Sequence, residues 1–346
     1  MKRLLLIDGS SLLFTSFFAS APKAYLRART DEERDQVLHK MLKTNSGLYT
    51  NGVLTMTRML LKLTSQHGFS HLAVAWDISR ETHRKERYAL YKAHRPEARP
   101  ELGEQFGTMQ RVLKAMNIAQ FKVDGFEADD IIGTLADRFE REIPVIIVTK
   151  DQDALQLVSE HTRVWLQTSK ADEYRELCGS TGLPYSVPDG YFEFTPITFE
   201  AVYGLSPVQM VDKKALEGDS SDNIPGVKGV GEASVVPLLQ EFRTVEELYA
   251  HIENLCPADE AAMKELFKAL GLRRSPLSYL LKDPSEDGDL VGKRAAELSK
   301  ELASIHRTVP IIMDVQMDSL QIEIDRLGMV RVFEELEFKA LLKAAM

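Results

Sequence analysis

The stretch "IPVIIVTKDQD" (residues 143–153) decides the fold class, because an unbroken apolar run leads directly into two carboxylates. Such a run is typical of a strand buried on both faces, and hence of a parallel sheet covered by helices. In extended geometry Asp151 and Asp153 point the same way, and like charges so placed repel unless a cation lies between them. The alternative is an exposed loop in which Asp153 caps the next helix.

Two other segments share this design. "RLLLID" (3–8) ends at Asp8, and "HLAVAWD" (71–77) ends at Asp77. Open α/β sheets place their ligands at the carboxyl ends of the strands, where we expect these acids to meet. For Asp8 alone the alternative is a turn, since Asp-Gly is a common turn dipeptide.

Helical patterns alternate with these strands in the first part of the chain, for example in "GVLTMTRMLLKLTSQHG" from Gly52. Further along, strand signals become sparse and helical patterns dominate. This order predicts a doubly wound α/β domain over residues 1–203 and a helical domain over 204–346. Residues 22–47 and 166–195 lack clear periodicity and are predicted to be surface insertions.

A third source of acids is the start of a predicted helix in "VDGFEADDIIGTLA". Glu127 and Asp130, three residues apart, share one face of that helix, and Asp129 is rotated by about 100° from either neighbour. The alternative is simple complementation of the helix dipole by acids in the first turn.

Two more acids, Asp219 and Asp222, lie one turn apart in "LEGDSSDNIPGVKGVGE". With these there are nine candidates, as many as the whole net charge of −9, so their convergence in one cleft would leave the rest of the protein neutral overall. Oxygen-only ligands indicate Mg²⁺ or Mn²⁺, and two such ions suit in-line hydrolysis of a phosphodiester. The predicted metal ligands are Asp8, Asp77, Glu127, Asp129, Asp130, Asp151, Asp153, Asp219 and Asp222.

Positive charge is concentrated in "RETHRKERYALYKAHRPEAR" (80–99), which carries seven Lys and Arg against three Glu. On a helix Arg84, Lys92 and Arg95 would fall on one stripe together with the tyrosines between them. The alternative is a solvated amphipathic helix, because charge runs usually lie on the surface. The position directly after Asp77 favours a role in gripping phosphate.

The glycines of "IPGVKGVGEASVVPLL" indicate two short helices joined by a glycine turn. The net acidity of the chain argues against binding nucleic acid by overall charge, so any DNA must be held locally. We expect free backbone N–H groups and a helix N-terminus to hold a phosphate there. The predicted DNA-binding residues are Gly226, Lys228, Gly229 and Gly231.

The cysteines and the N-terminal residues indicate the cellular compartment of the protein. Cys178 and Cys256 are the only cysteines, with no zinc-site spacing, which favours a reduced cytoplasm. The N-terminus mimics a signal peptide, but Asp8 and the polar residues after it interrupt its apolar region. We expect a cytoplasmic protein with no membrane span.

Six motifs together resemble the 5′-nuclease, or flap endonuclease, family. They are "LLLIDGSSLLF", "AVAWD", "RYALYKAHR", "GFEADDIIGTLA", "TKDQDALQLV" and "LEGDSSDNIPGVKGVGE", in the order that the family shows. The resemblance is strongest to the 5′→3′ exonuclease domain of bacterial DNA polymerase I and its stand-alone relatives. A weaker match, "ELSKELASIHRTVPI" and "VFEELEFKALL", extends it almost to the C-terminus.

The resemblance implies a Rossmann-like (PIN-like) nuclease core, a helical arch at about 78–105 and a C-terminal helix-three-turn-helix motif at about 216–240. It implies two Mg²⁺ or Mn²⁺ ions on the nine acids and a K⁺ ion at the motif. The family's arch lysine and arginine fall on Lys92 and Arg95, and Arg84 is a third catalytic candidate. Expected substrates are DNA 5′ flaps, nicked strands and RNA primers, cut by a monomer.

Two positions depart from the family pattern: His83 stands where Phe is usual, and Lys150 replaces Gly. No polymerase domain follows, so we expect a separate polymerase and ligase to act in the pathway. Two alternatives remain open, a non-catalytic DNA-junction binder and an RNA-directed nuclease. The first should have lost metal ligands, and the second should lack the glycine module.

Overall fold

The computed structural model describes residues 2–179, 187–253, 255–283 and 290–345. Its centre is a six-stranded sheet in the order β3-β2-β1-β4-β5-β6, parallel except for β6. The strands are β1 (Leu4–Asp8), β2 (His71–Ala75), β3 (Ala119–Phe121), β4 (Val145–Thr149), β5 (Thr162–Gln167) and β6 (Tyr191–Phe194). The strands predicted from apolar runs, β1, β2 and β4, are confirmed and adjacent.

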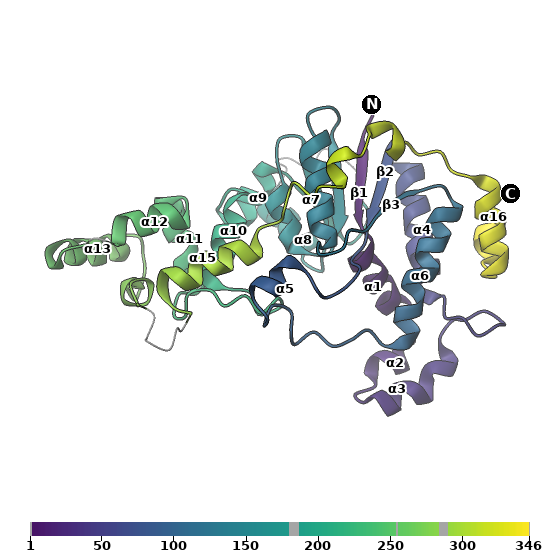
Figure 1. Cartoon of the computed structure of the whole chain (residues 1–346), viewed down its shortest axis with the longest axis horizontal. Helices are drawn as coiled ribbons and strands as arrows, with labels where there is room; N and C mark the ends of the chain where they lie inside the picture. The colour runs from purple at the N-terminus through teal and green to yellow at the C-terminus, as the bar shows by residue number, and fades with distance from the viewer. Residues whose placement is uncertain (1, 180–186, 254, 284–289, 346) are drawn as a thin grey trace.

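Helices cover both faces of this sheet (Figure 1). Alternate residues of β1 show why an unbroken apolar run is required: Leu4 and Leu6 share a core with α7, whereas Leu5 and Ile7 share another with α1, α4 and α6. The helices of this domain include α1 (Gly9–Ser20), α4 (Asn51–Gln66), α6 (Pro100–Ala115), α7 (Ala128–Phe139), α8 (Ala171–Cys178) and α9 (Pro196–Tyr203).

A helical domain follows, as predicted, and in it α15 packs along α10 (Figure 1). Its helices are α10 (Gln209–Glu217), α11 (Glu232–Phe242), α12 (Val245–Ile252), α13 (Pro257–Ala269), α14 (Leu277–Leu280) and α15 (Gly292–Ala303). The helix-three-turn-helix motif is expected at about 216–240, a region that holds the end of α10, the glycine loop (218–231) and most of α11. The two short helices expected within "IPGVKGVGEASVVPLL" are wrong, because that stretch contains turns followed by the single helix α11.

The C-terminal segment departs from the predicted division into two domains. It passes through η3 (Ile312–Asp314) and η4 (Met317–Leu320) to α16 (Arg326–Glu335) and α17 (Lys339–Ala345). Phe333 belongs to the same buried cluster as β1 and α6, so this end of the chain packs on the α/β domain. Apolar pattern alone does not say which domain a C-terminal helix joins.

The two predicted insertions contain regular structure. Within 22–47 lie α2 (Lys23–Arg27), α3 (Asp31–Val37) and η1 (Leu38–Lys40), with Tyr25 buried in a small satellite core. Residues 166–195 include α8 and β6 as well as 180–186, which lie outside the described residues. The prediction missed β6 because the charged Glu193 does not fit the apolar pattern of a buried strand. In the structure Glu193 is buried and accepts a 2.8 Å hydrogen bond from Nε1 of Trp165.

The predicted helix over 80–99 is wrong for most of its length. Helix α5 spans His83–Arg87, and turns and extended chain follow to the start of α6. Lys92 has a positive φ of 52°, and its N–H donates across to the carbonyl of Asp222 at 2.9 Å. Because this backbone bonds to the helical domain, it cannot continue its own i to i−4 ladder.

In the part of the chain that the structure describes, no helix has the length and apolar character that crossing a membrane requires.

Candidate active site

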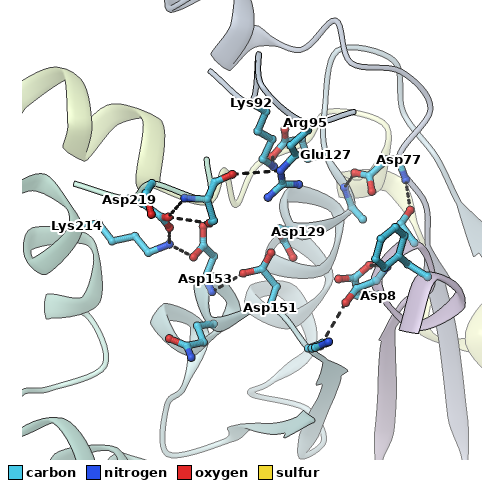
Figure 2. A pocket seen from close by; sticks show the side chains of 18 of the residues that line it. Asp8, Asp77, Lys92, Arg95, Glu127, Asp129, Asp151, Asp153, Lys214 and Asp219 are labelled. Atoms are coloured by element: carbon cyan, nitrogen blue, oxygen red, sulfur yellow. Dashed lines mark hydrogen bonds and ion pairs between the residues drawn. The ribbon is translucent and has the colours of Figure 1, made fainter. Parts of the chain in front are cut away.

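A cavity of about 900 Å³ opens where the carboxyl ends of β1, β2 and β4 meet the helical domain. Figure 2 shows the acidic side chains that surround it. Seven of the nine predicted metal ligands line it: Asp8, Asp77, Glu127, Asp129, Asp151, Asp153 and Asp219. The convergence expected from the strand ends is therefore present.

Hydrogen bonds to neighbouring elements fix the acids that follow β1 and β2. Asp8 ends β1 and caps α1, with one carboxylate oxygen accepting from the N–H of Ser11 and the other from the hydroxyl of Thr149, both at 2.9 Å. Asp77 accepts from the N–H of Ala128 at 2.9 Å, at the start of α7. Burial and the charges of nearby acids raise the pKa of Asp8 to about 7.

The acids at the start of α7 have two different roles. Glu127 and Asp130 form a capping box, so the reading of these acids as helix-terminal groups is correct for this pair. Asp129 between them faces the cavity, and among the described residues one of its carboxylate oxygens is buried with no hydrogen-bond partner. Burial, with the charges of Asp151 and Asp8, raises the pKa of Asp129 well above its usual value.

The acids after β4 lie at the start of η2 (Gln152–Leu157), which Asp151 caps by accepting from the N–H of Asp153 at 3.0 Å. The sequence alternative in which Asp153 is the cap is therefore wrong. Asp153 instead bonds to Lys214 of α10, which also contacts Asp219 at 2.6 Å. Sequence reasoning missed Lys214, although its spacing of five residues before Asp219 was visible.

Two basic residues after α5 pair with two other acids, Glu127 and Asp222. Nζ of Lys92 lies 2.9 Å from Oε2 of Glu127 and 3.5 Å from Oδ2 of Asp222, and Arg95 pairs with Asp222. The hydroxyl of Tyr91 donates to Glu127 at 3.1 Å. Lys92 and Arg95 both line the cavity, whereas Asp222 lies buried behind them.

Comparisons with known proteins agree with this geometry. Residues 3–179 match the family described as 5′-3′ exonuclease, N-terminal resolvase-like domain, and residues 205–279 match its C-terminal SAM fold. The chain is 33% identical over 320 residues to a 5′-3′ exonuclease of Halalkalibacterium halodurans, covering 92% of this chain and 88% of that protein. The chain belongs to the 5′-3′ exonuclease family.

This 5′-3′ exonuclease family member is also 35% identical, over 99% of its length, to DNA polymerase I of Bacillus caldotenax, of which it spans 32%. The chain thus covers about a third of such polymerases. The T5 D15 protein shares the fold, with a TM-score of 0.56 at 16% identity over 96% of this chain and 98% of that one. The catalytic core of Rad2 does so with a TM-score of 0.50 at 13% identity, over 100% of this chain and 93% of that one. The resemblance and the fold class predicted from the sequence are confirmed.

Arg84 and Asp130 do not lie where the sequence analysis placed them. The Arg84 guanidinium is buried and makes two hydrogen bonds to the Asp130 carboxylate, at 2.6 and 2.9 Å. It also donates to the carbonyls of Leu302 and Ser304, at the C-terminal end of α15. Neither residue lines the cavity. Helix spacing grouped Asp130 with Glu127 correctly, but it could not show that a buried arginine neutralises Asp130.

The glycine loop also differs from its expected role. Gly226 has φ +62°, its N–H donates to the hydroxyl of Ser299 at 2.9 Å, and an added Cβ would lie 2.3 Å from the backbone of Gly218. Gly229 has φ +94°, and its Cβ would lie 2.5 Å from the ring of Tyr279. These two glycines therefore allow close packing within the protein.

Lys228 and Gly231 remain candidates for DNA contact. Both are exposed, and Gly231 is the N-cap of α11, where no described atom outside its neighbours lies within 4 Å of the position of a Cβ. The backbone can approach a phosphate there without obstruction.

The cavity suits a hard divalent cation chemically. As the side chains lie, no three His, Cys, Asp or Glu among the described residues are arranged to hold a metal ion. Some of the acids instead pair with cations: Glu127 with Lys92, Asp222 with Arg95, and Asp153 with Lys214. However, the donors are oxygens, an oxygen of Asp129 is unpaired, and burial with the charge of Asp151 raises the pKa of Asp153 to about 7. Buried carboxylates that lie close together in this way fit Mg²⁺ or Mn²⁺.

Proposed function

We propose that this protein is a structure-specific 5′→3′ exonuclease and flap endonuclease that hydrolyses phosphodiester bonds with two divalent metal ions. The observation that carries the proposal is the cavity that seven acids from five parts of the chain line together with the cations Lys92 and Arg95. Membership of the 5′-3′ exonuclease family supports the direction of attack.

The acids that line the cavity would hold two Mg²⁺ or Mn²⁺ ions, which when bound activate water and neutralise charge on the phosphate. Lys92 and Arg95 would donate hydrogen bonds to the scissile phosphate. Tyr91 orients this pair, because its hydroxyl bonds to Glu127 and, at 3.3 Å, to Asp222. The buried pair of Arg84 with Asp130 fixes the start of α7, which carries Glu127 and Asp129.

Lys228 and Gly231 at the start of α11 would grip the phosphates of the duplex, aided by a K⁺ ion in the loop. The proposed substrates are DNA with 5′ flaps, nicks or RNA primers, in replication and repair. A separate polymerase and ligase would complete the repair. We further propose that the protein acts as a monomer in the cytoplasm.

The test uses the purified chain and end-labelled 5′-flap, nicked and single-stranded DNA, in Mg²⁺ and in EDTA. We expect cleavage of the flap and nicked duplexes that leaves 5′-phosphate and 3′-hydroxyl ends and stops in EDTA. Undiminished cutting in EDTA would overturn the metal mechanism. Binding of flap DNA without cutting in Mg²⁺ would instead indicate a junction-binding protein.

A further inference from the structure

Lys214 joins the two domains at the acidic cavity (Figure 2). It lies on α10, and its side chain is 10% exposed. Its Nζ pairs with Asp153, which belongs to the α/β domain, and lies 2.6 Å from Asp219 in the loop after α10. One ammonium group therefore holds a carboxylate from each domain.

The surroundings make this contact electrostatically strong. Two carboxylates at a buried site need a compensating cation, and removal of that cation leaves an uncompensated charge. Despite burial, the charge and hydrogen bond of Lys214 lower the pKa of Asp219 to about 2. Both acids line the cavity where the divalent ions are proposed to bind. An ion that takes these oxygens must compete with the ammonium group for them.

Resting on the proposed function, we propose that Lys214 is a positioning residue that occupies the Asp153–Asp219 carboxylate pair and is displaced when a divalent ion binds there. Lys214 therefore lowers the affinity of the site for metal and, without metal, holds α10 against the α/β domain. When a divalent ion binds, the contact that Lys214 makes between the domains is replaced by an ion held by the same two carboxylates.

The neighbouring Lys213 provides a matched control. It lies on the same helix and lines the same cavity, but it pairs with Glu217 one turn further along and not with Asp153 or Asp219. Both lysines carry the same charge and differ in whether they hold the two candidate ligands. Loss of a general positive charge near the cavity is therefore separable from loss of the specific contact.

The experiment measures Mn²⁺ binding by calorimetry and thermal unfolding in EDTA for wild type, Lys214→Met and Lys213→Met. We expect Lys214→Met to bind Mn²⁺ on the order of tenfold more tightly, because a competing charge next to the ion is removed. It should also unfold at a lower temperature in EDTA, because two acids then lack their cation. Lys213→Met should stay within about twofold of wild type in affinity, since its charge is more distant.

Unchanged or weaker Mn²⁺ binding by Lys214→Met, or an equal gain in Lys213→Met, would overturn the inference. If Lys214→Met does not fold in EDTA, Lys214→Gln provides the test, because it removes the charge and keeps a hydrogen-bond donor. It should show the same direction of change in affinity, and no gain in affinity would refute the competition. A wild-type protein that binds no Mn²⁺ and cuts no flap would overturn the proposed function and this inference together. Normal cutting by wild type with no gain in either Lys214 variant would overturn the inference alone.

Discussion

Nζ of Lys92 lies 2.9 Å from Oε2 of Glu127, so a cation of the segment after α5 directly faces the residue that caps α7. These residues are 35 positions apart in the chain, and their contact closes one side of the acidic cavity. Because Lys92 also lies near Asp222 of the helical domain, the segment that carries it is tied to both domains. This places a positive charge at the wall of the cavity, where a phosphate would enter.

Replacement of Lys92 should slow the chemical step. We expect Lys92→Ala to lower the single-turnover rate on a 5′-flap substrate about a hundredfold or more, the usual cost of losing one preorganised donor. Arg111→Ala is the control, because Arg111 pairs with Glu335 of α16 and does not line the cavity. This variant should cleave at the wild-type rate. A near wild-type rate for Lys92→Ala would refute the assignment.

Chemistry and duplex binding should be separable at Asp151. Its carboxylate accepts from the N–H of Asp153, and the amide oxygen of Asn can accept the same bond, so Asp151→Asn should keep η2 intact. We expect cleavage in Mg²⁺ to be abolished because a charged oxygen ligand is lost. Binding of duplex DNA in Ca²⁺ should persist, since the start of α11 lies in another domain. Loss of binding together with cleavage would contradict this division.

Gly229 and Gly231 should respond differently to alanine. Gly229→Ala should reduce the free energy of unfolding by about 1 kcal/mol or more, because φ is +94° and the new Cβ would meet Tyr279. In a Tyr279→Ala background the same change should cost less, which a double-mutant cycle in urea can measure. Gly231→Ala should have a small effect on stability, since no described atom obstructs its Cβ. An equal cost at both glycines would show that the Tyr279 contact is unimportant.

The pair of Arg84 with Asp130 should stabilise the fold. Arg84→Met leaves a buried carboxylate uncompensated and should cost about 3–5 kcal/mol in the free energy of unfolding. Arg84→Met combined with Asp130→Leu should recover much of that loss, since both charges are gone. Urea denaturation of the wild type, the single variants and the double variant measures both effects. A double variant no more stable than Arg84→Met would show that the carboxylate is not the cause.

The pH dependence of this stabilisation follows from Asp130. Burial opposes ionisation, but Arg84 prevails and lowers the pKa of Asp130 in the folded protein. A lowered folded pKa stabilises the protein above the carboxyl's unfolded pKa, and the effect is lost as the pH falls through the folded value. Acid titration of unfolding free energy should therefore be flatter for the Arg84→Met, Asp130→Leu double variant than for wild type.

Local sequence predicts the three central strands β1, β2 and β4 and the acids at their carboxyl ends. Unbroken apolar runs specify strands buried on both faces, and the carboxylate after each run must then lie at the carboxyl edge. Each of Asp8, Asp77 and Asp151 was therefore predictable from the few residues that directly precede it. Lys92 and Arg95 were predictable from the family motif, although the helix expected to carry them is absent.

Tertiary structure alone decided which charges pair and which stay available. Arg84 neutralises Asp130 from 46 positions away, and Lys214 reaches Asp153 across 61. Gly226 likewise packs against the backbone of Gly218, the residue that directly follows α10. Hydrophobic periodicity reflects the local chain, so it predicts which face of a helix or strand is buried and where that element ends. A buried ion pair depends on which faces meet and on the water they exclude, and these conditions exist only once the elements have packed.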